Sequence, residues 1–418
     1  MESPLQLSEV IDRSSRWLLK HQLPGGGWGE RPGKEASALN TAETMIALLD
    51  ARLVDTGDEK IHKAANFLLG SRIDEGPDLG AWPREFHLRK NGPLRRIPDL
   101  MRSAYALKAL IKSGRTISDR RIKESLQWLI ERQNSEEQDL GWGYRRGAES
   151  RILPSCHALH ALLLAFHAGA KQTRPAIEQG LRYLSEQARE DGSFGPDDSL
   201  RALHTVSVAL VLQAASRFRV GTSSHPQQAT QALRWLLDHP DPAMRPVEEL
   251  IEIDPHADGA GNYGFIFMTE TLLLNALMSS PETAHHKSAL ARTALERIKD
   301  NWDPARGGCY GPTVLSWSTA KTLAALTATS PHIQEFPRRQ PERGALPDLL
   351  PTLILATCVL LLMVFMYLLS QNGKLGLPEF SLITIAMLAL LLATRFIDQE
   401  VFSNLFKVVK GWGGKETR

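Results

Sequence analysis

Two carboxylates and an imidazole fall within one short segment, Asp254-Pro-His-Ala-Asp258. Carboxyl and imidazole groups at this spacing can exchange a proton or hold a cation. We therefore predict Asp254 and Asp258 as catalytic residues and His256 as a ligand-binding residue. Prolines and glycines place the segment in a loop, so a solvated, turn-forming cluster is the alternative.

A third carboxylate, Glu270, falls in the first turn of a predicted helix. The helix dipole alone is a sufficient reason for an acidic residue at that place. If the helix borders a central cavity, Glu270 is instead a buried acid. On that basis it joins the predicted catalytic residues.

Cys156, His157 and His160 stand at the start of one predicted helix, and His204 stands at the start of the next. His157 and His160 share a helix face because they are three residues apart. Sulfur and imidazole are preferred ligands of zinc, so zinc is the one cofactor that this cluster suggests. The adjacent Cys156 and His157 point in different directions, so we assign no metal site. We predict the three histidines, His157, His160 and His204, as ligand-binding residues.

Three aromatic residues, Tyr105, Phe267 and Trp317, lie on or near predicted helices that are otherwise rich in small residues. Aromatic faces around a cavity would suit an isoprenoid or a carbocation. All three are predicted ligand-binding residues, with core packing as the alternative.

A unit that repeats six times over residues 1–330 positions these side chains. Each unit has an amphipathic helix, predicted to be outer, then a glycine-rich turn with an aromatic residue, then a small-residue helix, predicted to be buried. The turns are Gly26-Gly-Trp-Gly29, Gly80-Ala-Trp-Pro83, Leu140-Gly-Trp-Gly143, Gly192-Ser-Phe-Gly195, Gly261-Asn-Tyr-Gly264 and Gly308-Cys-Tyr-Gly311. We expect the hairpins to close into a ring around an apolar hollow. Hydroxyl residues near the inner-helix starts are predicted to satisfy free amide groups there.

Residues 13–28 resemble the glutamine–tryptophan repeat of squalene–hopene and oxidosqualene cyclases. Matching places hold Arg13, Trp17, Leu18, Gln22, Gly26 and Trp28, while Ser14 departs from the usual Gly or Ala. A second copy contains Trp128, Gln133, Gly141 and Trp142. The resemblance covers about residues 8–330. It implies an all-α fold, the (α/α)6 toroid of six helical hairpins that terpenoid cyclases share with protein prenyltransferase β subunits, and we place this domain at residues 1–335.

The resemblance implies a cavity of the size of an isoprenoid, but the residues that carry out the usual reactions of these families are not found in the sequence. The Asp-x-Asp-Asp stretch of the cyclases does not occur in the sequence. The Asp, Cys and His zinc site of the prenyltransferases is not located either. Enzymatic activity therefore stays open.

Two long apolar runs follow the repeats, Leu349–Ser370 and Phe380–Ile397, with a short polar turn between them. Runs of about twenty apolar residues can cross a bilayer as helices. We predict a linker at 336–348, a transmembrane hairpin at 349–397 and a basic tail at 398–418. The tail could lie along the membrane surface or extend the second span. Two buried helices of a soluble core are the alternative to the hairpin.

Basic residues flank this hairpin on both sides, whereas its turn carries only Lys374. Since basic residues favour the cytoplasmic side, we expect the toroid on the cytoplasmic side of the inner membrane. Residues 1–20 lack the apolar stretch of a secretory signal. A net charge of +2 argues against nucleic acid as a partner.

Two functions fit these observations. In the first, a membrane-anchored, cytoplasm-facing protein of the prenyltransferase or terpene cyclase type binds an isoprenoid or similar apolar ligand in its toroid. In the second, the toroid is a binding module without chemistry. It would sense a lipid, a peptide or a partner protein and relay this to the membrane hairpin, for example in bacterial stress or phage defence.

Overall fold

The computed structural model divides the chain into two units, residues 1–338 and 339–418. The structure describes residues 6–87, 94–135, 139–196, 199–222, 224–244, 247–251, 263–286, 288–309 and 315–333. The predicted linker, membrane hairpin and basic tail lie outside the described residues, as do Asp254, His256 and Asp258. Among the helices within the described ranges, none combines the length and the apolar character that a bilayer crossing requires.

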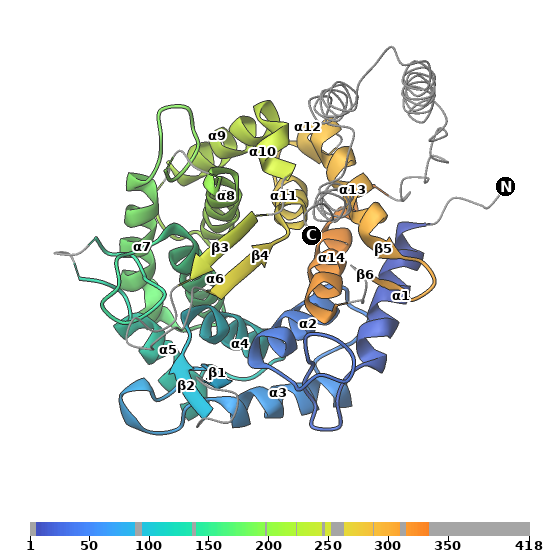
Figure 1. The fold of residues 1–418 in the computed structure, drawn as a ribbon. Helices are drawn as coiled ribbons and strands as arrows, with labels where there is room; N and C mark the ends of the chain where they lie inside the picture. The colour runs from blue at the N-terminus through green and yellow to red at the C-terminus, as the bar shows by residue number, and fades with distance from the viewer. Residues whose placement is uncertain are drawn as a thin grey trace, which may run out of the picture. The chain divides into compact units, whose positions relative to one another are not determined.

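Six inner helices form a closed ring in the first unit (Figure 1). They are α2 (Ala38–Asp50), α4 (Leu100–Lys112), α6 (Ile152–His167), α8 (Arg201–Phe218), α11 (Thr269–Met278) and α14 (Ser316–Thr329). Each inner helix contacts the next, and α14 contacts α2. This contact closes the ring.

Six outer helices surround the ring, and each packs against an inner helix. They are α1 (Leu7–Lys20), α3 (Glu59–Ser71), α5 (Arg120–Glu131), α7 (Arg174–Glu186), α9 (His225–Asp238) and α13 (Ala289–Asn301). Helix α1 packs against α14, so the first and last repeats meet at a seam. The predicted toroid of helical hairpins is confirmed for the described residues.

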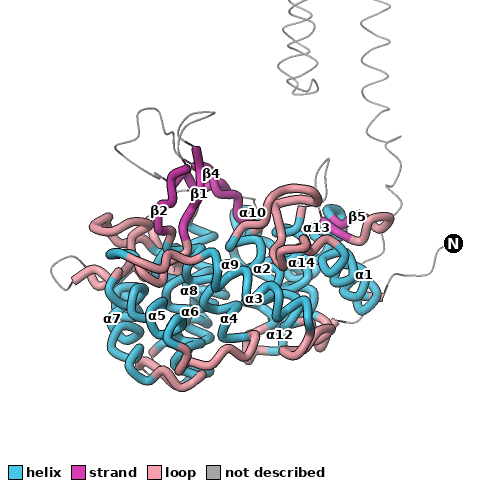
Figure 2. Tube along the Cα trace, turned by 90° about the horizontal axis from the view of Figure 1, so that it is seen from below, coloured by secondary structure: helices cyan, strands magenta, loops and turns pink. Residues whose placement is uncertain are grey.

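The all-α prediction is wrong in one respect, because three antiparallel β-hairpins interrupt the helices. Their strands are β1 (Pro83–His87) with β2 (Leu94–Pro98), β3 (Val247–Ile251) with β4 (Tyr263–Phe267), and β5 (Trp302–Asp303) with β6 (Gly308–Cys309). The first two hairpins stand at one end of the ring (Figure 2). Aromatic and β-branched residues, as in Tyr263–Phe267, favour a strand over a turn. The remaining short helices are η1 (Gly76–Asp78), η2 (Lys171–Thr173), α10 (Pro240–Met244) and α12 (Thr283–His286).

The glutamine–tryptophan motif ties the outer helices α1 and α5 to the turns that follow them. The Gln22 side-chain amide donates to the carbonyl oxygens of Gly26 and Lys60, both at 2.7 Å. The Trp28 indole N–H donates to the carbonyl oxygen of Leu18 at 2.7 Å, so that this oxygen near the end of α1 accepts a second donor besides the backbone N–H of His21. Gln133 and Trp142 repeat both interactions in the third unit. The role of the motif is therefore structural.

The inner-helix hydroxyls hold the turns and do not cap the helices as predicted. The backbone N–H of Trp28 donates to Thr41 Oγ1 at 2.9 Å, and that of Trp82 donates to Ser103 Oγ at 2.9 Å. Ser155, Thr205 and Thr319 accept the corresponding turn N–H in the same way. The caps of α2 and α4 come from residues four positions earlier, Ser37 and Asp99. The hydroxyls lie one turn inside the helix, where the helix amides already have backbone acceptors. Their oxygens therefore accept N–H groups of the preceding turn instead.

Replacing Ser103 by alanine is expected to lower the free energy of unfolding by about 1–3 kcal/mol, because the buried N–H of Trp82 loses its acceptor. Urea unfolding of the full chain measures this loss. The exposed Ser118 provides the control, since Ser118→Ala leaves no buried donor unpaired. Equal stability losses in the two variants would contradict this assignment.

Candidate central cavity

A cavity of about 600 Å³ lies inside the ring of inner helices. Its described lining comes from all six inner helices and from residues directly after two of them: Glu43, Ile46, Asp50, Arg52, Tyr105, Lys108, Lys112, Cys156, His157, His160, Ser207, Leu210, Arg217, Thr271, Leu272, Asn275, Ser279, Ala320, Lys321, Ala324, Thr327 and Ala328. The exposed lining residues Asp50, Arg52 and Arg217 belong to the ends of α2 and α8. The cavity therefore reaches the surface where the inner helices end.

The predicted apolar hollow is only part of the picture, because apolar side chains such as Ile46, Leu210 and Leu272 share the lining with charged ones that are mainly positive. Five cationic side chains face two carboxylates among the described lining residues, an excess of three positive charges. The cations are Arg52, Lys108, Lys112, Arg217 and Lys321, and the carboxylates are Glu43 and Asp50. An excess of positive charge in a concave, low-dielectric site attracts an anion.

A buried ion pair connects α2 and α14 across the lining. Lys321 Nζ lies 2.9 Å from Glu43 Oε1, and the two side chains are 12% and 4% exposed. Lys321 Nζ also donates to the Tyr105 hydroxyl at 3.3 Å. Burial opposes the charge of Lys321, but Glu43 and Tyr105 outweigh it and raise the lysine pKa. Burial is also the main cause of the raised pKa of Tyr105.

Lys108 differs from the other two lysines of the cavity. Lys112 forms an ion pair with Asp50, and Lys321 forms one with Glu43. Within the described part of the chain Lys108 has no carboxylate partner, and its Nζ lies 5.0 Å from the centre of the Tyr105 ring. Burial, followed by the nearby charge of Lys112, lowers the pKa of Lys108 to about 8. Lys108 is thus a cation available for pairing with a ligand.

Three predicted ligand-binding residues, Tyr105, His157 and His160, meet in the cavity wall. The ring centres of Tyr105 and His157 are 5.3 Å apart, and His157 Nε2 is buried without a hydrogen-bond partner. Burial, with the charge of Lys108, lowers the pKa of His157 to about 3 and that of His160 well below its usual value. Both rings are therefore neutral at neutral pH.

The other predicted site residues do not join this group. His204 is buried on α8, and Trp317 is half-buried on α14, but neither is among the described residues that line the cavity. Glu270 is 3% exposed at the start of α11 and likewise does not line it; burial raises its pKa. Phe267 ends strand β4, and its side chain lies outside the described part.

Zinc was the one cofactor that the sequence suggested. Cys156, His157 and His160 line the cavity, whereas His204 does not. Across the described ranges no three metal-ligating side chains lie close enough together to hold an ion. The thiol of Cys156 is buried, which raises its pKa and disfavours the thiolate that metals bind.

Sequence reasoning missed the basic residues of the cavity, above all Lys108, Lys112 and Lys321. A signal for them exists in the spacing. Tyr105, Lys108 and Lys112 are three and seven residues apart and form one stripe on an otherwise apolar helix. A charged residue that recurs at helical spacing on a buried helix indicates a cavity wall.

Solved structures share this fold. A type II terpene cyclase from Scytonema, MstE, is 15% identical over 78% of this chain and 99% of its own, with a TM-score of 0.51. A variant of that cyclase in complex with geranylgeranyl dihydroxybenzoate has the same identity and TM-score over 98% of its chain. An α-1,6-mannanase from Salegentibacter, bound to α-1,6-mannotriose, is 12% identical over 78% of this chain and all of its own, also at 0.51. No family model matches the chain. The similarity establishes the α/α toroid fold.

Proposed function

We propose that the protein binds an anionic isoprenoid, such as a prenyl diphosphate, in the central cavity. The carrying observation is the excess of positive charge inside the inner ring, with Lys108 free of a carboxylate partner among the described residues. Apolar side chains such as Ile46, Leu210 and Leu272 share the same wall and suit a hydrocarbon chain. The volume of about 600 Å³ falls in the range of small-molecule sites.

The toroid fold supports the isoprenoid part of this proposal. The structural neighbour MstE binds geranylgeranyl dihydroxybenzoate, which joins a prenyl chain to an acidic ring. The mannanase neighbour holds an uncharged sugar in the same fold, so the fold alone does not determine the ligand and the residues that line the cavity do. In this chain those residues favour an anionic head group.

Binding without acid catalysis is the form of this function that the described lining favours. Both described carboxylates of the cavity are engaged, Glu43 by Lys321 and Asp50 by Lys112. A carboxylate held by a lysine is a poor proton donor to an alkene. Catalysis by Asp254, Asp258 or Glu270 stays a prediction, to be tested by their amide variants.

We also propose that residues 349–397 anchor the protein in the cytoplasmic membrane with the toroid on the cytoplasmic side. The support is the length and apolar character of the two runs and the basic residues around them. An isoprenoid could then pass from the bilayer to the cavity. The full chain should stay in the membrane pellet after alkaline carbonate extraction; release into the supernatant would contradict the anchor.

Calorimetric titration of the full chain in lipid nanodiscs tests the ligand. Farnesyl diphosphate is expected to bind about tenfold more tightly than uncharged farnesol, because charge-assisted contacts to the lysines are lost in the alcohol. Lys108→Met should remove most of this preference, whereas Lys123→Met, at an exposed position on α5, should leave it unchanged. Equal affinity for the diphosphate and the alcohol would overturn the proposal.

The affinity for farnesyl diphosphate is expected to fall as the pH rises from 7 to 9. Lysine is charged below its pKa, so Lys108, with a pKa near 8, loses its positive charge in this interval. The other charged or titratable groups of the described lining are Glu43, Asp50, Arg52, Tyr105, Lys112, Cys156, His157, His160, Arg217 and Lys321. The pKa values of Lys321 and Tyr105 are raised and those of the two histidines lowered, so these groups do not titrate there. Titrations at both pH values should show the decrease in the wild type and not in Lys108→Met.

A further inference from the structure

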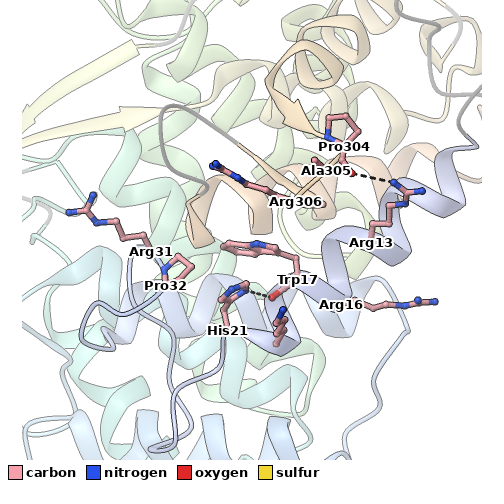
Figure 3. Close-up of a pocket in the computed structure, with 11 residues that line it drawn as sticks. Arg13, Arg16, Trp17, His21, Arg31, Pro32, Pro304, Ala305 and Arg306 are labelled. Carbon is pink, nitrogen blue, oxygen red and sulfur yellow. Dashed lines mark hydrogen bonds between the residues drawn. The ribbon is translucent and has the colours of Figure 1, made fainter.

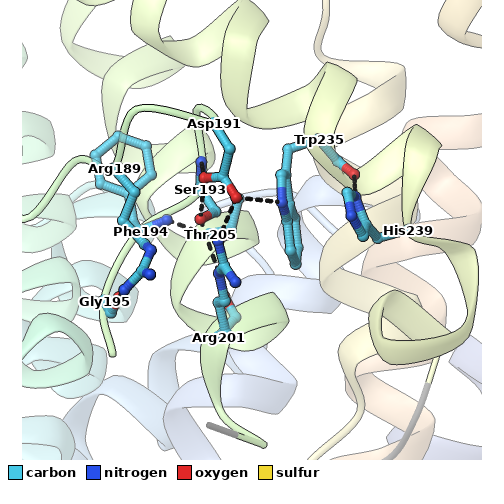
Figure 4. Close-up of polar contacts among 9 residues, drawn as sticks. All are labelled: Arg189, Asp191, Ser193, Phe194, Gly195, Arg201, Thr205, Trp235 and His239. Carbon is cyan, nitrogen blue, oxygen red and sulfur yellow. Dashed lines mark hydrogen bonds and ion pairs between the residues drawn. The ribbon is translucent and has the colours of Figure 1, made fainter. Parts of the chain in front are cut away.

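A cluster of aspartate, arginine and tryptophan occurs at two places on the outside of the ring, and Figure 4 shows the one around Trp235. The indole N–H of Trp235, on the outer helix α9, donates to Asp191 Oδ2 at 3.1 Å. Arg201 forms an ion pair with the same carboxylate, and its guanidinium carbon lies 5.0 Å from the centre of the Trp235 ring. His239 stacks on that indole with ring centres 4.4 Å apart. The turn thus supplies the Asp191 carboxylate, which accepts from the Trp235 indole and pairs with the Arg201 guanidinium.

A similar cluster forms around Trp128, on α5, with an arginine that directly follows this outer helix instead of one from an inner helix. Its indole N–H donates to Asp78 Oδ1 at 3.1 Å, and Arg132 pairs with Asp78 while lying 4.8 Å from the ring centre. In both clusters the carboxylate belongs to the turn of the preceding repeat. The chain itself therefore shows which group fits between an outer-helix tryptophan and an arginine.

At the seam the tryptophan is present and the carboxylate is not. Trp17 and His21, on α1, reproduce the pair of Trp235 and His239: the ring centres are 4.3 Å apart, and His21 Nδ1 lies 2.7 Å from the Trp17 carbonyl oxygen. The turn of the last repeat has Gly307 at φ 75°, where the fourth repeat has Gly192 at φ 87°.

The residue before that glycine is Asp191 in the fourth repeat and Arg306 at the seam. The position of Asp78, four residues before the buried turn residue, holds Ala305. In the described part of the chain the Trp17 indole N–H has no acceptor. The seam keeps the indole donor of the cluster and lacks its anion; His21 stands at the place of Arg132, and the guanidinium groups of the seam come from other positions, such as Arg13 and Arg306.

A pocket of about 750 Å³ occupies this place (Figure 3). Its described lining includes Arg13, Arg16, Trp17, Lys20, His21, Arg31 and Arg306, and no carboxylate. Three of the arginines have ion-pair partners beside the pocket, in Glu9, Asp12 and Asp303. Lys20 and Arg31 have none within the described ranges. The pocket therefore carries uncompensated positive charge over an aromatic floor.

We propose that the seam pocket binds the phosphate group of a ligand, with a phosphate oxygen in the place that Asp191 and Asp78 hold in the other repeats. The two lining cations without an ion-pair partner in the described ranges, Lys20 and Arg31, favour a phosphate with more than one negative charge over a single carboxylate, and arginine donors match a phosphate in pairs. The pocket volume leaves room for the rest of the ligand against Trp17 and His21. A soluble phosphorylated molecule and a phospholipid head group share this chemistry.

Calorimetric titration of the full chain with inorganic pyrophosphate and with short-chain dihexanoyl phosphatidic acid tests the proposal. Both titrations use a Lys108→Met background, which removes the lysine of the central cavity that has no carboxylate partner among the described residues. We expect at least one of the two probes to bind. Binding of pyrophosphate alone identifies a soluble ligand, and binding of the phosphatidic acid alone identifies a lipid head group.

Arg306→Asp restores the carboxylate that the fourth repeat has. It should weaken binding of the probe by about tenfold or more while the thermal unfolding midpoint stays the same or rises. Trp17→Phe should weaken binding by about threefold to tenfold through loss of the indole donor. Arg120→Asp makes the same charge change at an exposed position on α5 and should bind as the parent does. Binding of neither probe, or equal binding by Arg306→Asp and its parent, would overturn the proposal.

Discussion

Replacing Trp28 by alanine is expected to lower the free energy of unfolding by about 3–5 kcal/mol. The side chain is fully buried in the turn between α1 and α2, so its removal leaves a large cavity there. The variant also loses the hydrogen bond from the indole to the carbonyl oxygen of Leu18. Urea unfolding of the full chain, followed by circular dichroism, measures the loss.

Trp28→Phe separates the two contributions. It keeps most of the aromatic bulk and removes the donor, so a loss of about 1–3 kcal/mol is expected. If Trp28→Ala cost no more than Trp28→Phe, packing of the turn aromatic would not hold the repeat together.

Replacing Lys321 by methionine is expected to cost about 3–5 kcal/mol of folding stability, because the buried Glu43 carboxylate loses its cation. The same unfolding experiment measures it. The double variant Lys321→Met with Glu43→Leu should recover most of this loss, since a buried pair can often be exchanged for apolar residues at little cost. Additive destabilisation by the two substitutions would show that the ion pair does not couple the helices.

The repeated unit allowed the ring to be predicted from sequence, because each helix type has its own pattern. Outer helices alternate polar and apolar faces, as around Trp128, and the glutamine–tryptophan residues fix where each turn lies. The shortest β-hairpin was missed because its two-residue strands, Trp302–Asp303 and Gly308–Cys309, depend on pairing partners that no local pattern shows.

The character of the cavity could not be predicted, because a few side chains decide it. Averaged over its length, α14 is small and apolar, yet its single Lys321 faces the interior and meets Glu43 from the other end of the unit. Such a pairing depends on ring closure, which joins residues almost three hundred positions apart. The seam pocket has the same origin, since Arg306 and Trp17 meet only when the last repeat reaches the first.

A photoreactive analogue of farnesyl diphosphate, with a diazirine in its prenyl chain, tests most directly whether the central cavity is the ligand site. After irradiation of the full chain in nanodiscs, peptide mass spectrometry locates the attached group. We expect labels on α4, α6 and α14, suppressed by excess farnesyl diphosphate and reduced in Lys108→Met. Labels confined to the outer helices or to residues 339–418, or labels that excess ligand does not suppress, would contradict a ligand-binding cavity inside the ring.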